Sequence, residues 1–156
     1  MNRRKFGKIF FGLLCCSILS TKGCTKKSKE SNESFIKACK KGNLKEVKRL
    51  LEEGTDVNSQ DKDQNTALKW VIYYRHLEIM KYLLEKGADV NPKNKDGHTA
   101  LMATAYVGFP EATKLVIAHG ANINARDFEG ITALGWATIR GHNKVKEILL
   151  KHGAKE

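Results

Sequence analysis

Apolar residues recur along this chain at the spacing of one face of a helix. Val47, Leu50 and Leu51, for example, stand at i, i+3 and i+4, and residues so spaced lie on the same side of an α-helix. The same pattern continues in later segments, where it predicts short helices that come in pairs. These pairs cover residues 35–39 and 44–53, then 67–74 and 77–86, then 100–106 and a helix that starts at Pro110.

Two short phrases repeat along the chain at one constant step. The first phrase is GTDVN at 54–58, GADVN at 87–91, GANIN at 120–124 and the shortened GA at 153–154. The second phrase, Thr-Ala-Leu, begins at Thr66, Thr99 and Thr132. Two independent markers with one shared period indicate internal repeats, and a period of this size is typical of solenoids, propellers or arrays.

These features together resemble the ankyrin repeat. The resemblance is carried by Thr-x-Leu before a short helix, a glycine near the helix turn, a Leu-Leu pair and then Gly-Ala-Asp-Val-Asn. It covers residues 34–156 and implies an all-α solenoid of about four repeats with short β-turn fingers. In that family the array is a protein-binding scaffold, so the expected partner is another protein and no enzymatic activity is expected. The implied repeats are 34–60 as N-terminal cap, 61–93, 94–126, and 127–156 as C-terminal cap.

The two terminal repeats are predicted to be caps because polar residues replace apolar ones at matching positions. Lys37 and Arg49 occupy the positions that Trp70 and Tyr82 hold one repeat later, and Lys146 replaces an apolar residue in the last repeat. A terminal repeat has a neighbour on one side only and needs a polar outer face.

Two departures from the family pattern bear on stability. Gln64 stands where Gly97 and Gly130 turn the later fingers, so the first complete finger is expected to be strained or differently shaped. The histidine that usually follows the Thr-x-Leu start is replaced, and the hydrogen-bond network that it commonly makes between repeats is expected to be absent. The replacing residues are Lys69, Met102 and Gly135.

The family resemblance also implies where a partner lies, namely across the concave face formed by the finger tips and the first helices. The positions of this chain that match that face are Lys62, Asp63, Asn65, Tyr73, Tyr74, Lys93, Lys95, Asp96, His98, Tyr106, Val107, Arg126, Phe128, Glu129, Ile131, Ile139 and Arg140. We expect Tyr73, Tyr74, Tyr106 and Phe128 to form an aromatic strip bordered by basic residues, because interface hot spots favour Tyr, Trp and Arg. Trp70 and Trp136 are instead expected to pack in the core. Asn58, Asn91 and Asn124 are expected to bond the backbone of their finger turns.

The segment 1–23 is predicted to be a signal peptide. Arg3, Arg4, Lys5 and Lys8 precede an apolar run at 9–19. Such a run matches the core of a signal peptide, which has about 7 to 15 residues, and is short for a membrane span of about 20. Export of the protein is therefore expected.

Cys24 and its surroundings resemble a bacterial lipoprotein signal. That resemblance implies a diacylglycerol on Cys24, cleavage before it, and a polar tether over residues 24–33. The family prefers an aliphatic residue three positions before the cysteine and a small one two before it, whereas this chain has Thr21 and Lys22. Ordinary cleavage near Gly23 and an uncleaved anchor remain open. The expected location is a membrane anchor in the bacterial cell envelope, with a periplasmic or secreted protein as the alternative.

The net charge of +11 changes this picture little. Five of the 28 basic residues and none of the 17 acidic residues lie within residues 1–23, which leaves 23 against 17, or +6, for the rest. Nucleic-acid binders usually show a clustered basic stripe, whereas Lys and Glu alternate along the helices here, so nucleic acid is not an expected partner. Electrostatic binding of anionic lipid or nucleic acid is kept as a remote alternative.

No cofactor, metal or small-molecule substrate is expected. The five histidines never stand at i, i+3 or i, i+4, and His119 and His152 are assigned to helix ends, where an imidazole complements the helix dipole. An enzyme would need a convergent set of nucleophile, base and oxyanion donors, for which Asp63, His98 and Tyr106 are merely neighbouring candidates. Within the class of binding proteins, an envelope scaffold, an immunity-type enzyme inhibitor and a surface factor stay open.

Overall fold

The computed structural model describes residues 21–155, with side chains from residue 29 onward. Its helices are α1 (Thr21–Lys41), α2 (Leu44–Glu52), α3 (Ala67–Tyr73), α4 (Leu77–Glu85), α5 (Ala100–Val107), α6 (Pro110–Ala118), α7 (Ala133–Ile139) and α8 (Asn143–Lys151). The predicted all-α class is confirmed, since the extended pairing in this part of the chain amounts to two isolated bridges. Most of the predicted signal peptide lies outside the described residues.

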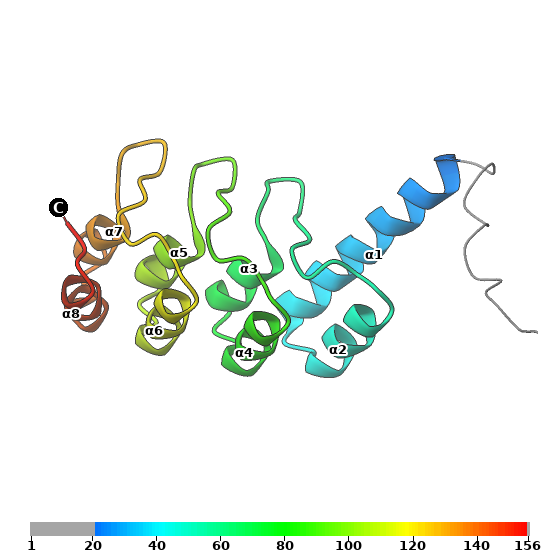
Figure 1. The fold of residues 1–156 in the computed structure, drawn as a ribbon, viewed down its shortest axis with the longest axis horizontal. Helices are drawn as coiled ribbons and strands as arrows, with labels where there is room; N and C mark the ends of the chain where they lie inside the picture. The colour runs from blue at the N-terminus through cyan, green and yellow to red at the C-terminus, as the bar shows by residue number, and fades with distance from the viewer. Residues whose placement is uncertain (1–20, 156) are drawn as a thin grey trace, which may run out of the picture.

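The helices stack as pairs in a single row, and the loops that join one pair to the next project to one side (Figure 1). We call these loops the first finger (53–66), the second finger (86–99) and the third finger (119–132). No helix of the described chain combines the length and the apolar character that crossing a membrane requires.

Each of the three later pairs begins with the same threonine cap. The hydroxyl oxygens of Thr66, Thr99 and Thr132 accept hydrogen bonds from backbone N–H groups three positions on, at 3.3, 3.4 and 3.2 Å. A cap of this kind satisfies one of the donors that the first turn of a helix leaves unpaired and contributes about 1 kcal/mol. The recurring Thr-Ala-Leu phrase therefore marks where α3, α5 and α7 start.

Apolar side chains from neighbouring pairs form one continuous core. Leu68, Leu101 and Leu134, which are one repeat apart, are each only 1% exposed. The buried hydroxyls of Thr104 and Thr113 are hydrogen-bonded to each other at 3.1 Å, as buried polar groups require. Neighbouring repeats thus bury each other's helices, which is how a solenoid gains its stability.

The first pair has the polar outer face predicted for a cap. Lys37 and Arg49 are exposed, and the Arg49 guanidinium pairs with Glu46 and Glu53 along α2. At the other end Leu150 is 48% exposed, because the last pair has a neighbour on one side only.

Helix α1 is longer than the helix predicted over residues 35–39. It begins at Thr21, so the segment assigned to a polar tether at 24–33 has helical backbone. Two of its side chains already belong to the array: the Ser31 hydroxyl lies 2.8 Å from the Thr55 hydroxyl, and Asn32 accepts a hydrogen bond from the Ser59 hydroxyl at 3.1 Å. The N-terminal cap therefore starts before residue 34.

The three asparagines that follow the Gly-Ala phrase join neighbouring repeats, which corrects the prediction that they bond their own finger turns. The Oδ1 atoms of Asn58, Asn91 and Asn124 accept from the backbone N–H groups of Asp89, Asn122 and Lys155 at 2.8 to 2.9 Å. Each acceptor belongs to one repeat and each donor to the next. These bonds hold adjacent fingers in register.

Candidate functional site

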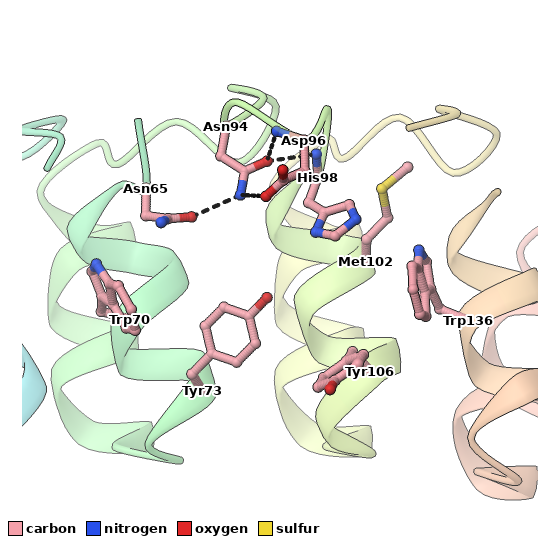
Figure 2. A pocket seen from close by; sticks show the side chains of 9 residues that line it. All are labelled: Asn65, Trp70, Tyr73, Asn94, Asp96, His98, Met102, Tyr106 and Trp136. Carbon is pink, nitrogen blue, oxygen red and sulfur yellow. Dashed lines mark hydrogen bonds between the residues drawn. The ribbon is translucent and has the colours of Figure 1, made fainter. Parts of the chain in front are cut away.

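Four aromatic side chains form a continuous row along the first helices of the later pairs. The ring centroids of Trp70 and Tyr73 are 5.8 Å apart, those of Tyr73 and Tyr106 are 6.2 Å apart, and those of Tyr106 and Trp136 are 5.6 Å apart. Figure 2 shows these rings lying side by side on α3, α5 and α7. Centroid separations in this range are those of favourable aromatic pairs.

The repeat register explains this row. Trp70 and Tyr73 stand at i and i+3 on α3, so they share one helix face. Tyr106 stands one repeat after Tyr73, and Trp136 stands two repeats after Trp70, each at the matching position. The middle repeat has Ala103 at the tryptophan position. No third indole therefore fills the space between Trp70 and Trp136.

A pocket of about 410 Å³ occupies this space between the rings and the fingers. Its lining is Asn65, Trp70, Tyr73, Asn94, Asp96, His98, Met102, Tyr106 and Trp136. The helices supply an aromatic wall, and the first and second fingers supply a polar rim (Figure 2). A concave, mainly apolar site with a few convergent polar groups is the usual form of a binding site.

The polar rim is held in place by one buried amide. The Oδ1 atom of Asn94 accepts from the backbone N–H groups of Asp96 and His98 at 3.0 and 2.8 Å. Its Nδ2 atom donates to Oδ1 of Asn65 at 2.9 Å and reaches the Asp96 carboxylate at 3.4 Å. Asn94 therefore fixes its own finger and ties it to the preceding one.

Both indoles are oriented by aspartates that begin the turns of the fingers. The Nε1 atom of Trp70 donates to Asp61 at 2.8 Å, and that of Trp136 donates to Asp127 at 2.9 Å. Burial alone raises the pKa of Asp127, but hydrogen bonds from the Ile131 backbone and the Trp136 indole are among the effects that bring the pKa below its usual value. The charged carboxylate keeps each tryptophan ring edge-on to its finger.

His98 joins the second finger to the last repeat. Its Nε2 atom lies 3.4 Å from Oδ2 of Asp127, and its ring meets the Trp136 ring edge to face at a centroid distance of 5.4 Å. The imidazole thereby packs against Trp136 where the second finger meets the pocket.

Lys69 makes a connection between repeats that the sequence did not predict. Its side chain is 1% exposed, and its Nζ atom donates to the His98 carbonyl at 2.9 Å. Burial lowers the pKa of Lys69 to about 8, while Asp61 and Asp96 act in the opposite direction. The expected loss of a network at this position is therefore partly wrong, because the lysine itself bonds the next finger.

Two cations of the chain already lie on faces of the aromatic row. The Nζ atom of Lys40 is 3.6 Å from the centroid of the Trp70 ring, and Cζ of Arg140 is 4.3 Å from the centroid of the Tyr106 ring. Both distances are within the range of cation–π interactions.

The structure brings five of the residues predicted for partner contact into the pocket, and Arg140 lies beside it. These five are Asn65, Tyr73, Asp96, His98 and Tyr106. It also places Trp70 and Trp136 there, where both are half-buried and pack against the core as expected while one part of each ring lines the pocket, and it adds Asn94 and Met102. The recurrence of tryptophan at matching positions of two repeats was a sequence signal for this pocket. The repeat period alone does not say which side of the helix faces the neighbouring repeat.

The remaining predicted contact residues lie outside the pocket lining. They are Lys62, Asp63, Tyr74, Lys93, Lys95, Val107, Arg126, Phe128, Glu129, Ile131 and Ile139. Phe128 is 72% exposed and lies in the third finger, so the predicted strip does not extend to it. Tyr74 does extend the row, since its ring stacks on Trp70 at 6.1 Å.

The candidates considered for catalysis do not gather in one place. His98 and Tyr106 line the pocket, whereas the Asp63 carboxylate pairs with Lys95 at 3.4 Å outside it. Among the described residues, no group of three His, Cys, Asp or Glu side chains is placed to hold a metal ion.

Stacked helix pairs with projecting fingers define a solenoid of structural repeats. The chain matches the family model described as Ankyrin repeats (3 copies) over residues 9–94 and 89–156, and it belongs to the ankyrin-repeat family. That membership indicates a protein–protein interaction module, and proteins of the family are generally binding scaffolds without enzymatic activity. No curated protein matches the chain.

Proposed function

We propose that this chain is an exported, lipid-anchored ankyrin-repeat protein of a bacterial envelope that binds another protein through its concave face. The single observation that carries the binding proposal is the row of Trp70, Tyr73, Tyr106 and Trp136 around an open pocket. Tryptophan and tyrosine are among the residues that contribute most to protein interfaces.

The pocket is supported by bonds that exist before any partner arrives. Asn94 fixes the second finger, Asp61 and Asp127 fix the two indoles, and Lys69 links two repeats. A preformed surface avoids much of the ordering cost of association. Recognition by rigid complementarity is therefore the mechanism that we propose.

Capture by photo-crosslinking tests the binding proposal. A photoreactive residue at Tyr74, which is 52% exposed beside the aromatic row, should crosslink one protein in the native host. The same residue at Glu111, which is exposed on α6, is the matched control and should not. Tyr106→Ala should reduce the Tyr74 crosslink severalfold. Equal capture from both positions, or capture that ignores Tyr106→Ala, would contradict a concave binding face.

Export and anchoring are supported by the sequence before the array. The basic start and the apolar run at 9–19 are typical of a signal peptide, and the cysteine at position 24 resembles the lipid acceptor of a lipoprotein signal, although Thr21 and Lys22 depart from it. Acyl chains add about 0.8 kcal/mol of membrane affinity per buried CH₂ group. The intact mass of the protein from the membrane fraction tests this part. We expect a chain that starts at Cys24 and carries acyl groups, and a full-length mass or an unmodified soluble chain would contradict it.

A further inference from the structure

We infer that the pocket takes a cation, namely the guanidinium of an arginine side chain presented by the protein partner. This inference rests on the proposed function and specifies the chemistry of that same face. It follows from three features of the pocket: ring faces in the same row that hold cations, a carboxylate on the rim, and a buried lysine, Lys69, whose ammonium group is bonded to backbone carbonyls instead.

The aromatic row accepts cations within the chain itself. Lys40 lies over Trp70 at one end of the row and Arg140 lies over Tyr106 towards the other. Electron-rich ring faces attract ammonium and guanidinium groups, most strongly where water is excluded. Tyr73 and Trp136 line the same space and have no such intramolecular cation among the described residues.

The one carboxylate that lines the pocket belongs to Asp96. Its only side-chain hydrogen bond within the described chain is the long 3.4 Å contact from the Asn94 amide, so it retains acceptor capacity. Burial, followed by Tyr106 and Asp96, raises the pKa of Tyr73, and its hydroxyl therefore stays a neutral group directed towards the finger side of the pocket (Figure 2). A cation in the pocket would therefore have the Asp96 carboxylate as a charge partner and the Tyr73 hydroxyl oxygen as a hydrogen-bond acceptor.

The nearest buried cation does not occupy this space. Lys69 does not line the pocket, and its Nζ atom is directed to the carbonyl oxygens of His98 and Pro92 at 2.9 and 3.5 Å. The carboxylates of Asp61 and Asp127, which accept hydrogen bonds from the indoles, add negative charge on the finger side of the aromatic row. The pocket therefore combines aromatic faces with a negative rim.

Arginine fits this combination better than lysine or a neutral ring. A planar guanidinium stacks on an aromatic face and donates two parallel hydrogen bonds to one carboxylate. A pocket of about 410 Å³ also exceeds what a single ammonium needs. In the proposed complex the guanidinium lies between Tyr73 and Trp136 and bonds Asp96 at its edge.

The chain supplies its own reporter, because its only two tryptophans are Trp70 and Trp136 and both line the pocket. Acetyl-Gly-Arg-Gly-amide should change their fluorescence saturably when titrated into the full-length protein. The peptide with citrulline, a neutral isostere of arginine, should bind at least about fivefold more weakly, as loss of a cation–π contact and an ion pair implies. The lysine peptide should lie between the two.

Two variants identify the acidic group. Asp96→Asn keeps the size of an exposed side chain and should weaken the arginine peptide at least about fivefold. Asp63→Asn is the matched control, because Asp63 holds the same position one repeat earlier and does not line the pocket. It should leave the affinity unchanged.

Equal responses to arginine and citrulline, no response to either, or equal losses for both variants would overturn the assignment of a cation. Any of these results would leave the proposed concave interface standing if the crosslink at Tyr74 still depended on Tyr106. Loss of that crosslink dependence would remove the proposed function itself. The two failures are therefore distinguishable.

Discussion

Among the residues that the structure describes, two that are not glycine hold a backbone conformation that favours glycine. Gln64 has φ of 61° and Arg75 has φ of 59°, whereas glycines occupy the matching positions of other repeats with similar φ, as Gly97 does at 82°. This conformation costs a residue with a Cβ atom about 1 kcal/mol or more. The strain predicted at Gln64 from the sequence is thus confirmed, and the same strain at Arg75 was missed.

Gln64→Gly should raise the free energy of unfolding by roughly 0.5 to 1 kcal/mol, because relief of the left-handed strain exceeds the entropy that glycine adds to the unfolded chain. Urea unfolding at constant pH measures the change. Arg75→Gly is the informative comparison, since it relieves the same strain but loses hydrogen bonds to the Val107 and Gly108 carbonyls. A loss of stability in Gln64→Gly would show that the finger needs its glutamine.

Lys69 should make stability depend on pH in the alkaline range. Its pKa is about 8 when folded, below the ordinary value of 10.5, so between these values the unfolded chain binds more protons and stability rises with pH. From pH 7.5 to 9 the gain should be about 1 kcal/mol. Burial raises the pKa of Cys39 to about 12. The contribution of Cys39 to the free energy of unfolding therefore falls as pH rises.

The variant Lys69→Met separates the pH dependence due to Lys69 from that due to Cys39, because it removes the lysine ammonium group and leaves the Cys39 thiol in place. Unfolding by urea at pH 7.5, 8.5 and 9 should show a rise for the wild-type protein relative to the variant. The middle repeat already has Met102 at the matching position, so methionine is compatible with this part of the fold. Parallel curves for the two proteins would contradict a depressed lysine pKa.

Cys39 should be nearly inert to thiol reagents in the folded protein. Its side chain is 0% exposed, and its raised pKa keeps it protonated at neutral pH, whereas the thiolate is the reactive form. Labelling with a maleimide followed by peptide mass spectrometry should detect the Cys39 peptide as modified only after denaturant is added. Rapid labelling in native buffer would mean that α1 opens from the core.

At the scale of elements, the joints between repeats depend on single asparagines. Asn91 accepts from the Asn122 backbone at 2.9 Å and donates to the Gly120 carbonyl at 3.1 Å. Asn58 makes only the first kind of bond, to Asp89. The repeat pattern showed that these residues recur, but a single repeat cannot show a bond whose donor lies in the next one.

Asn91→Ala should therefore cost about 1 to 2 kcal/mol of stability, and Asn58→Ala about half as much, since each net hydrogen bond contributes about 0.5 to 1.5 kcal/mol. Thermal and urea unfolding of both variants give the comparison. Equal costs would contradict the extra bond to Gly120.

Helix positions were predicted well because they depend on local signals. Thr66, Thr99 and Pro110 mark helix starts that the structure places at the next residue or at the proline itself. The site was predicted less completely. Its aromatic wall depends on which side Trp70 and Trp136 face, and its rim on an Asn94 side chain that bonds another finger. Both depend on contacts between repeats, which no periodicity within one repeat encodes.

At the scale of the whole molecule, binding should depend weakly on salt. The proposed interface is centred on ring faces and includes a single ion pair at the exposed Asp96, so salt should weaken it only modestly. Binding of nucleic acid or anionic lipid through the excess positive charge would instead fall steeply as the salt concentration rises. Capture of the partner at low salt and at about 0.5 M salt separates these cases. Loss of most of the crosslink at high salt would favour the electrostatic alternative.

The long first helix has a consequence for how the array would be presented at a surface. Because α1 runs unbroken from Thr21 into the first pair, the stretch between Cys24 and Phe35 measures about 17 Å as a helix. A lipid on Cys24 would then be joined to the array by a rigid helix instead of a flexible linker. The pocket would be held at a fixed height and tilt above the bilayer, so that only partners at that level could reach it.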